Sequence, residues 1–179
     1  MRSFLFSIAF CFLSLFANAF KTVQVLTPQS FLLNSTTKLG GKTRIVLPVS
    51  LPLNTLKWYY SVTTSKNTNS NQPINLLSQL LRFEDPTGTL TDVVSSLSVP
   101  QGYANCDVFL LAGDNCSNFL DKWTKSFNYS MPYSRMNYVS GVVEVPAIPS
   151  GYSACLGFRN NSNLYGVYVT VDIVAIVQE

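Results

Sequence analysis

The C-terminal stretch of alternating residues constrains the fold more than any other feature. Residues 164–177 read Leu-Tyr-Gly-Val-Tyr-Val-Thr-Val-Asp-Ile-Val-Ala-Ile-Val. Alternation over this length is typical of a β-strand with one buried face. The other parity is polar early and apolar late, at Val174 and Ile176, so we expect the late half to be covered on both faces. The residues expected to face the core are Val167, Val169, Val171, Ile173, Ala175 and Val177.

Further short strands, bounded by Gly, Pro and Asn, are predicted at 43–47, 56–64, 106–111, 123–129, 138–145 and 152–158. Two stretches show helical spacing instead, one from Ile74 to Leu81 and one from Leu90 to Leu97. A β-hairpin around residues 86–88 is the alternative there. The pattern predicts a mostly β protein: an antiparallel, jelly-roll-like β-sandwich with a short two-helix insertion near residues 74–98.

The N-terminus has the three parts of a secretory signal peptide. Arg2 precedes an apolar run from Phe4 to Phe16, and Ala17-Asn18-Ala19 follows. This run falls short of the roughly 20 residues that span a bilayer as a helix. We therefore expect residues 1–19 to be a signal peptide, residues 20–179 to form a single β-sandwich domain, and the protein to be secreted or held at the cell surface without stable membrane insertion.

Charge and histidine content exclude several function classes. The chain has twelve Lys and Arg residues, nine Asp and Glu residues and no histidine. The charges are scattered, so neither the basic stripe of a nucleic-acid binder nor a polybasic membrane patch is visible along the sequence. Without histidine, Ser-His-Asp hydrolases, HExxH proteases and ordinary zinc sites are excluded.

Three cysteines remain after removal of Cys11 with the signal peptide. In an oxidising compartment they tend to pair. We expect a local Cys106–Cys116 disulfide, with Cys155 as a buried free thiol in a core strand. Cys106–Cys155 is the rival pairing, and the sequence does not decide between them.

No catalytic constellation is recognisable, so we expect no enzyme activity. The interior carboxylates form no evident pair of the kind a glycosidase needs; they are Glu84, Asp85, Asp92, Asp107, Asp114, Asp121, Glu144 and Asp172. Asp114 and Asp121, with Asn115 and Asn118, are weak calcium candidates. A solvated polar loop is the preferred interpretation, and no cofactor is expected.

Aromatic residues are the candidate binding residues. Exposed rings stack on sugars or anchor protein interfaces, although core packing is the commoner use of any single ring. The candidates are Trp58, Tyr60, Trp123, Tyr129 and Tyr133. Asn34, Asn115, Asn128 and Asn160 begin N-glycosylation sequons, which also arise by chance in a chain rich in Asn, Ser and Thr.

The segment from Pro149 to Ile173 combines Gly-Tyr, a short apolar strand, Asn-Asn and a long valine strand. It resembles the last hairpin of GOLD-type and bacterial pre-peptidase C-terminal jelly-roll domains, and more closely that of uncharacterised secreted bacterial sandwich proteins. The resemblance implies a binding or accessory module and carries over no catalytic residue.

The sequence therefore favours a secreted, non-catalytic module that binds carbohydrate or a cell-surface protein. The alternative is a structural or assembly subunit of an extracellular or envelope complex, joined through sheet edges. A hydrolase that uses only carboxylates is the third hypothesis.

Overall fold

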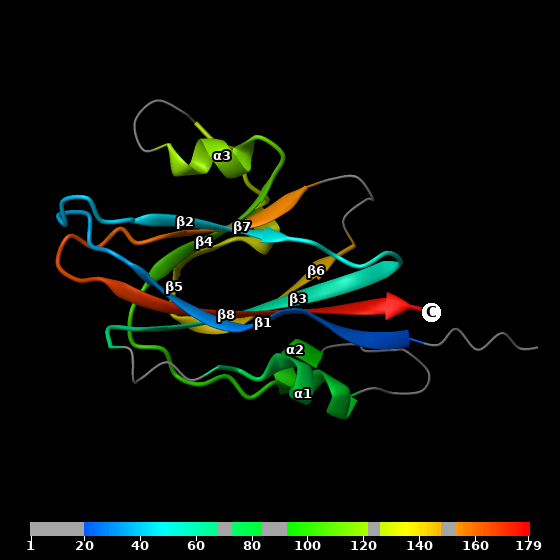
Figure 1. Cartoon of the computed structure of the whole chain (residues 1–179). Helices are drawn as coiled ribbons and strands as arrows, with labels where there is room; N and C mark the ends of the chain where they lie inside the picture. Colours follow the sequence, from blue (N-terminus) through cyan, green and yellow to red (C-terminus); the bar gives the residue numbers. More distant parts are fainter. Residues whose placement is uncertain (1–19, 68–72, 84–92, 122–125, 148–152) are drawn as a thin grey trace, which may run out of the picture.

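The computed structural model describes residues 20–67, 73–83, 93–121, 126–147 and 153–179. It forms two antiparallel sheets of four strands each, which lie face to face (Figure 1). The first sheet has the order β1-β8-β3-β6 and the second has the order β2-β7-β4-β5. The strands are β1 (Phe20–Leu33), β2 (Arg44–Val49), β3 (Thr55–Ser65), β4 (Cys106–Ala112), β5 (Arg135–Tyr138), β6 (Ser140–Pro146), β7 (Ala154–Arg159) and β8 (Val167–Gln178).

The strand pairing is that of a jelly roll. β1 pairs with β8, β2 with β7, β3 with β6 and β4 with β5, which is one long antiparallel hairpin rolled into two sheets. The predicted sandwich is thus confirmed. The strand expected at 138–145 is divided: Tyr138 ends β5 in the second sheet, and β6 starts at Ser140 in the first.

β8 is buried on both faces, as its sequence predicts. Val167, Val169, Val171, Ile173 and Ala175 are fully buried between the sheets, and Val177 packs at the margin of this core. On the opposite face, Val174 and Ile176 lie under helices. The strand is apolar at every position from Ile173 to Val177 because it has a hydrophobic layer on each side.

The helical layer covers the outer face of the first sheet (Figure 1). It consists of α1 (Leu76–Leu80), the 3-10 turn η2 (Leu81–Phe83) and α2 (Val93–Ser96). Leu76, Leu80 and Val93 pack against Tyr59 and Val174 of the sheet. The helical prediction is confirmed for these described residues, whereas residues 86–88, where the alternative hairpin was centred, lie outside them.

The second sheet is covered by α3 (Asn115–Leu120), which the sequence analysis treated as a loop. Phe109 and Leu111 of β4 pack there with Phe119 and Phe127. The strand predicted at 123–129 is wrong over its described part, 126–129, which has no strand structure. Phe127 and Tyr129, two residues apart, both contribute to this apolar cluster instead. The turn η3 (Met131–Tyr133) follows.

The disulfide prediction is also wrong. Cys116 of α3 is bonded to Cys155 of β7, 39 positions away, and Cys106 is a buried free thiol. Cys106 faces the core between the sheets, whereas Cys155 faces the outer side, where α3 lies. Cys106 therefore lies on the opposite face of the second sheet from Cys116 and Cys155, the two partners considered for it. In the described residues, no helix is long and apolar enough to cross a membrane.

Each sheet edge carries a feature that hinders pairing with another strand. β1 has register shifts around Pro28, and β2 contains Pro48. β5 has four residues, with Asn137 in a left-handed conformation, and β6 ends at Pro146. Bulges, prolines and short edge strands are the usual means of blocking edge-to-edge association.

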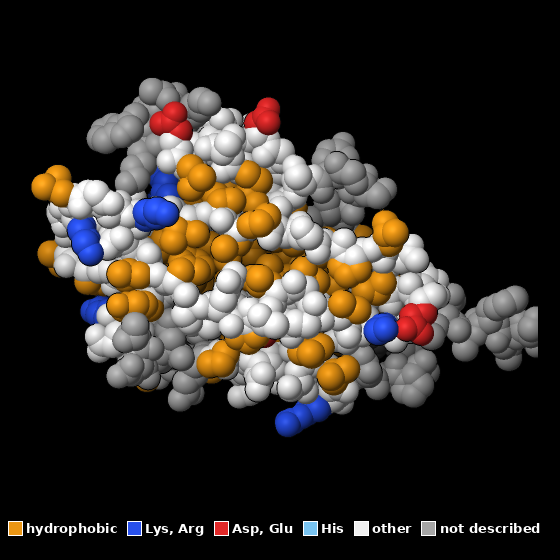
Figure 2. All heavy atoms as spheres, in the orientation of Figure 1, with side chains coloured by type: hydrophobic (Ala, Val, Ile, Leu, Met, Phe, Trp, Pro, Cys, Tyr) orange, Lys and Arg blue, Asp and Glu red, His pale blue; other side chains and the backbone are white. Residues whose placement is uncertain are grey.

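β1 and β2 lie at the same open side of the sandwich, where an apolar band is visible across the centre of Figure 2. Apolar side chains from both strands pack against the core there and stay partly exposed; they are Val25, Leu26, Phe31, Ile45 and Leu47.

Candidate functional site

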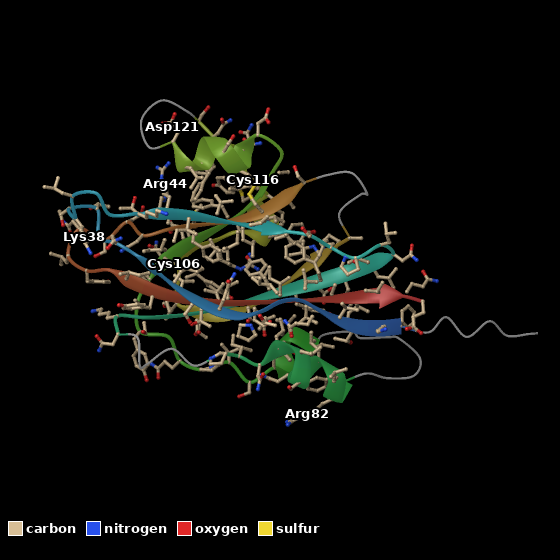
Figure 3. The ribbon with its side chains drawn as sticks, viewed as in Figure 1. Lys38, Arg44, Arg82, Cys106, Cys116 and Asp121 are labelled. Atoms are coloured by element: carbon tan, nitrogen blue, oxygen red, sulfur yellow. A yellow bond between two sulfur atoms is a disulfide. The ribbon has the colours of Figure 1, made fainter. Side chains whose placement is uncertain are left out.

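A polar pocket of about 290 Å³ lies at one end of the sandwich. It is formed where the start of β4, the end of β5 and the loop between β7 and β8 meet. Cys106, labelled in Figure 3, marks the start of β4. The lining residues are Asn105, Cys106, Asp107, Asn137, Asn161, Ser162, Leu164 and Tyr165. We call this the amide pocket because three of its side chains are asparagines.

Asp107 is the charged group of the pocket, and it is 3% exposed. Its Oδ2 accepts hydrogen bonds from Nη2 of Arg159 at 2.8 Å and from Nε at 3.1 Å. The same oxygen accepts one from Nδ2 of Asn161 at 2.5 Å. Oδ1 accepts the backbone N–H of Asn137 at 2.9 Å. Both oxygens are therefore held in place, and the carboxylate is an oriented acceptor.

The register between β4 and β7 brings the two charged side chains of this ion pair together. Asp107 of β4 and Arg159 of β7 are direct cross-strand partners on the outer face of the second sheet, where opposite charges attract. The Arg159 guanidinium also lies 5.0 Å above the Phe109 ring. Asn137 has φ 51°, a left-handed conformation that asparagine adopts more readily than most residues. In this conformation, the backbone N–H of Asn137 donates to Asp107.

Asn160 holds the β7–β8 loop that forms one wall. It is 1% exposed. Its Nδ2 donates to the carbonyls of Tyr165 at 2.9 Å and Asn34 at 3.1 Å, and its Oδ1 accepts from the N–H of Ser162 at 2.8 Å. The loop is therefore bonded to the body of the protein at several points. Asn161, Ser162 and Tyr165 are presented to the pocket by this fixed backbone.

The pocket combines polar groups with an apolar rim. Each asparagine amide offers a donor and an acceptor. Leu164 is 83% exposed, and the Tyr165 ring lies 4.3 Å from the ammonium of Lys66. Burial raises the pKa of the Cys106 thiol, which therefore stays protonated near neutral pH and is a poor nucleophile. This arrangement suits hydrogen bonding to a polar ligand.

A second pocket of about 400 Å³ lies beside β2 and includes Lys42, Arg44 and Leu120. Arg44 Nη1 donates to the carbonyls of Phe119 at 2.8 Å and Asp121 at 3.0 Å, at the end of α3. Burial, and then the nearby Arg159, lower the pKa of Arg44. Arg44 thus stabilises the C-terminus of α3, and we assign it a structural role.

Two of the predicted binding residues belong to the hydrophobic core. Trp58 and Tyr60 are fully buried between the sheets, and the Tyr60 hydroxyl donates to the carbonyl of Tyr133 at 2.7 Å. Both rings are core residues because one face of β3 packs on the second sheet, while the helical layer covers the other. They are inaccessible to a ligand, so their assignment as binding residues is corrected.

The other predicted rings lie in separate places. Tyr129 is half-buried beside α3, with its ring 5.1 Å from that of Phe109. Tyr133 packs at the margin of the core between the sheets. Trp123 lies outside the described residues. Asp114 and Asp121, the calcium candidates, flank opposite ends of α3, and within the described chain no three His, Cys, Asp or Glu side chains gather as a metal site would require.

The sequence pattern identified Asp107 only as one of several carboxylates without an evident pair, and the three asparagines of the pocket were not predicted as site residues. The available signal was a charged residue inside an otherwise apolar strand, at Asp107 and again at Arg159. Charges at such positions are expected to pair across the sheet. No family model, curated protein or solved structure matches this chain.

Proposed function

We propose that this chain is a secreted, non-catalytic binding module that holds a carbohydrate in the amide pocket. The observation that carries the proposal is the buried Asp107 carboxylate, with both oxygens already bonded to protein donors, in a pocket whose walls carry three asparagine amides. A fixed polar wall loses little entropy when a ligand binds.

A sugar matches this wall chemically. Each hydroxyl donates and accepts a hydrogen bond, as each amide does, and the C–H faces of a sugar ring suit an apolar rim such as that of Leu164 and Tyr165. The volume lies at the lower end of the range for small-molecule sites. A single sugar residue at the end of a glycan is the expected size of ligand.

The test is binding to a glycan array, followed by titration of the best glycan. Asn105→Ala and Asn137→Gly each remove an amide from the pocket. Glycine keeps the left-handed backbone at position 137, and with it the N–H that bonds Asp107. Loss of one or two hydrogen bonds should weaken binding about tenfold.

Asn163→Ala is the matched control, because Asn163 is an exposed asparagine of the same loop that does not line the pocket. We expect its affinity to equal that of the unmodified chain. Absence of glycan binding, or equal weakening by Asn163→Ala and Asn137→Gly, would contradict the proposal.

A role as an assembly subunit is the second candidate, and the apolar band between β1 and β2 favours it. The blocked sheet edges argue against assembly by strand addition, so a partner would pack on side chains. Sedimentation equilibrium tests self-assembly. The unmodified chain should form an oligomer whose share rises with concentration, and Ile45→Asp should shift it to monomer. An unmodified chain that is monomeric at every concentration would rule out self-assembly.

A further inference from the structure

Two loops lie side by side at the end of the sandwich that carries the amide pocket. They are residues 34–43, between β1 and β2, and residues 160–166, between β7 and β8. The Thr36 N–H donates to the carbonyl of Ser162 at 2.9 Å, and the Thr37 hydroxyl donates to the carbonyl of Asn163 at 2.8 Å. We call these paired loops, with Lys66 at the end of β3, the leucine tip.

The tip exposes two leucines that have no place in the core. Leu39 is 98% exposed and Leu164 is 83% exposed. Leu164 follows Asn163, whose carbonyl accepts the Thr37 hydroxyl, and Leu39 lies in a turn closed by the bond from the Gly41 N–H to the carbonyl of Lys38. A single exposed leucine is ordinary in a folded protein, but two on adjoining loops fit an interaction surface.

The charge around these leucines is positive. Lys38 and Lys42 are exposed in the first loop, and Lys66 is exposed where its ammonium lies over Tyr165. Figure 3 shows Lys38 at this end, and the left end of Figure 2 shows orange and blue side chains without red. Neither loop contains Asp or Glu. The nearby carboxylate, Asp107, is paired with Arg159.

Other lysines of the described chain have carboxylate partners. Lys21 lies 3.7 Å from Glu179, and Lys57 lies 3.4 Å from Glu144. Lys38, Lys42 and Lys66 are thus the described lysines without a carboxylate partner, and all three belong to the tip. The sequence does not reveal it, because its lysines come from two separate segments and meet only in the fold.

We propose that the leucine tip docks on an anionic lipid surface. Leu39 and Leu164 enter the headgroup region, and Lys38, Lys42 and Lys66 face the lipid phosphates. Apolar insertion combined with basic residues is the general basis of interfacial binding, and each lysine near an anionic surface strengthens binding about fivefold. Such docking is peripheral and reversible, and it requires no membrane-spanning segment.

The test is vesicle flotation with residues 20–179, which contain every described element and omit the apolar run from Phe4 to Phe16. One set of vesicles is pure phosphatidylcholine, and the other contains about a third phosphatidylglycerol. We expect binding at least tenfold tighter to the anionic set and lost at high salt. Leu39→Ser with Leu164→Ser, and separately Lys38→Ala with Lys66→Ala, should each weaken it about tenfold or more.

Two controls match these changes at other places. Leu53→Ser alters a leucine that is 82% exposed in the β2–β3 turn, at the opposite end of β2. Arg82→Ala alters an exposed cation of the helical layer, labelled in Figure 3. Both should bind like the unmodified chain, and circular dichroism should show all variants folded. Equal binding to the two vesicle types, no binding to either, or no loss in the folded leucine variant would each overturn the proposal.

Discussion

Two aspartates are buried on the outer faces of the two sheets, and their surroundings differ. Asp107 is paired with a guanidinium. Asp172 of β8 is 1% exposed, and it accepts hydrogen bonds from neutral donors: Oδ1 from Nε2 of Gln24 at 2.6 Å, and Oδ2 from the N–H of Leu76 at 3.0 Å. Asp172 thereby joins the start of α1 to the first sheet.

Burial raises the pKa of Asp172 above its ordinary value of 3.8, although its hydrogen bonds oppose the rise. The folded chain therefore binds this proton more tightly than the unfolded chain. The stability gained from protonation is complete below pH 3.8 and is lost as the pH rises through the folded pKa.

Urea unfolding of the unmodified chain and of Asp172→Asn tests this at a series of pH values. We expect the free energy of unfolding of the unmodified chain, minus that of the variant, to fall as the pH rises from about 3 to 7. A difference that rises over this interval, or stays level, would show that the carboxylate is not disfavoured in the fold.

At the scale of elements, sequence periodicity predicted the segments whose pattern is long and regular. The long strand β8 and the helical layer were predictable because alternation and helical spacing are local properties. The position of α3 was not predictable, because its six residues are too short for a clear period. The disulfide depends on α3 lying over β7, so local spacing favoured the wrong partner.

The Cys116–Cys155 bond should contribute substantially to stability, because it closes a long loop between α3 and β7. Replacing both cysteines with alanine should lower the free energy of unfolding by about 2–4 kcal/mol. Urea titration measures this loss.

Cys106→Ala is the control, since it leaves the disulfide intact and should cost less. Peptide mapping without reduction should recover a Cys116–Cys155 link, and a thiol reagent should label Cys106 only after unfolding. A link that contains Cys106 would contradict the fold at this point.

At the scale of the whole molecule, one end of the jelly roll gathers the features that point to binding. The amide pocket and the leucine tip share the β7–β8 loop, whereas the apolar band follows the open side. This grouping was not predictable from sequence, because Asn105, Asn137 and Asn161 belong to segments that only the strand pairing brings together. Trp58 and Tyr60 were wrongly predicted to be binding residues for a similar reason, because the segments that bury them are distant in sequence.

The most direct test of the central claim is a two-dimensional NMR titration that follows asparagine side-chain amide signals. The ligand is the glycan that binds best on the array. The account predicts saturable shifts for Asn105, Asn137 and Asn161, and none for Asn128, an exposed asparagine outside the pocket. Shifts confined to other residues would place the ligand elsewhere, and unchanged spectra at saturating glycan would contradict carbohydrate binding in the amide pocket.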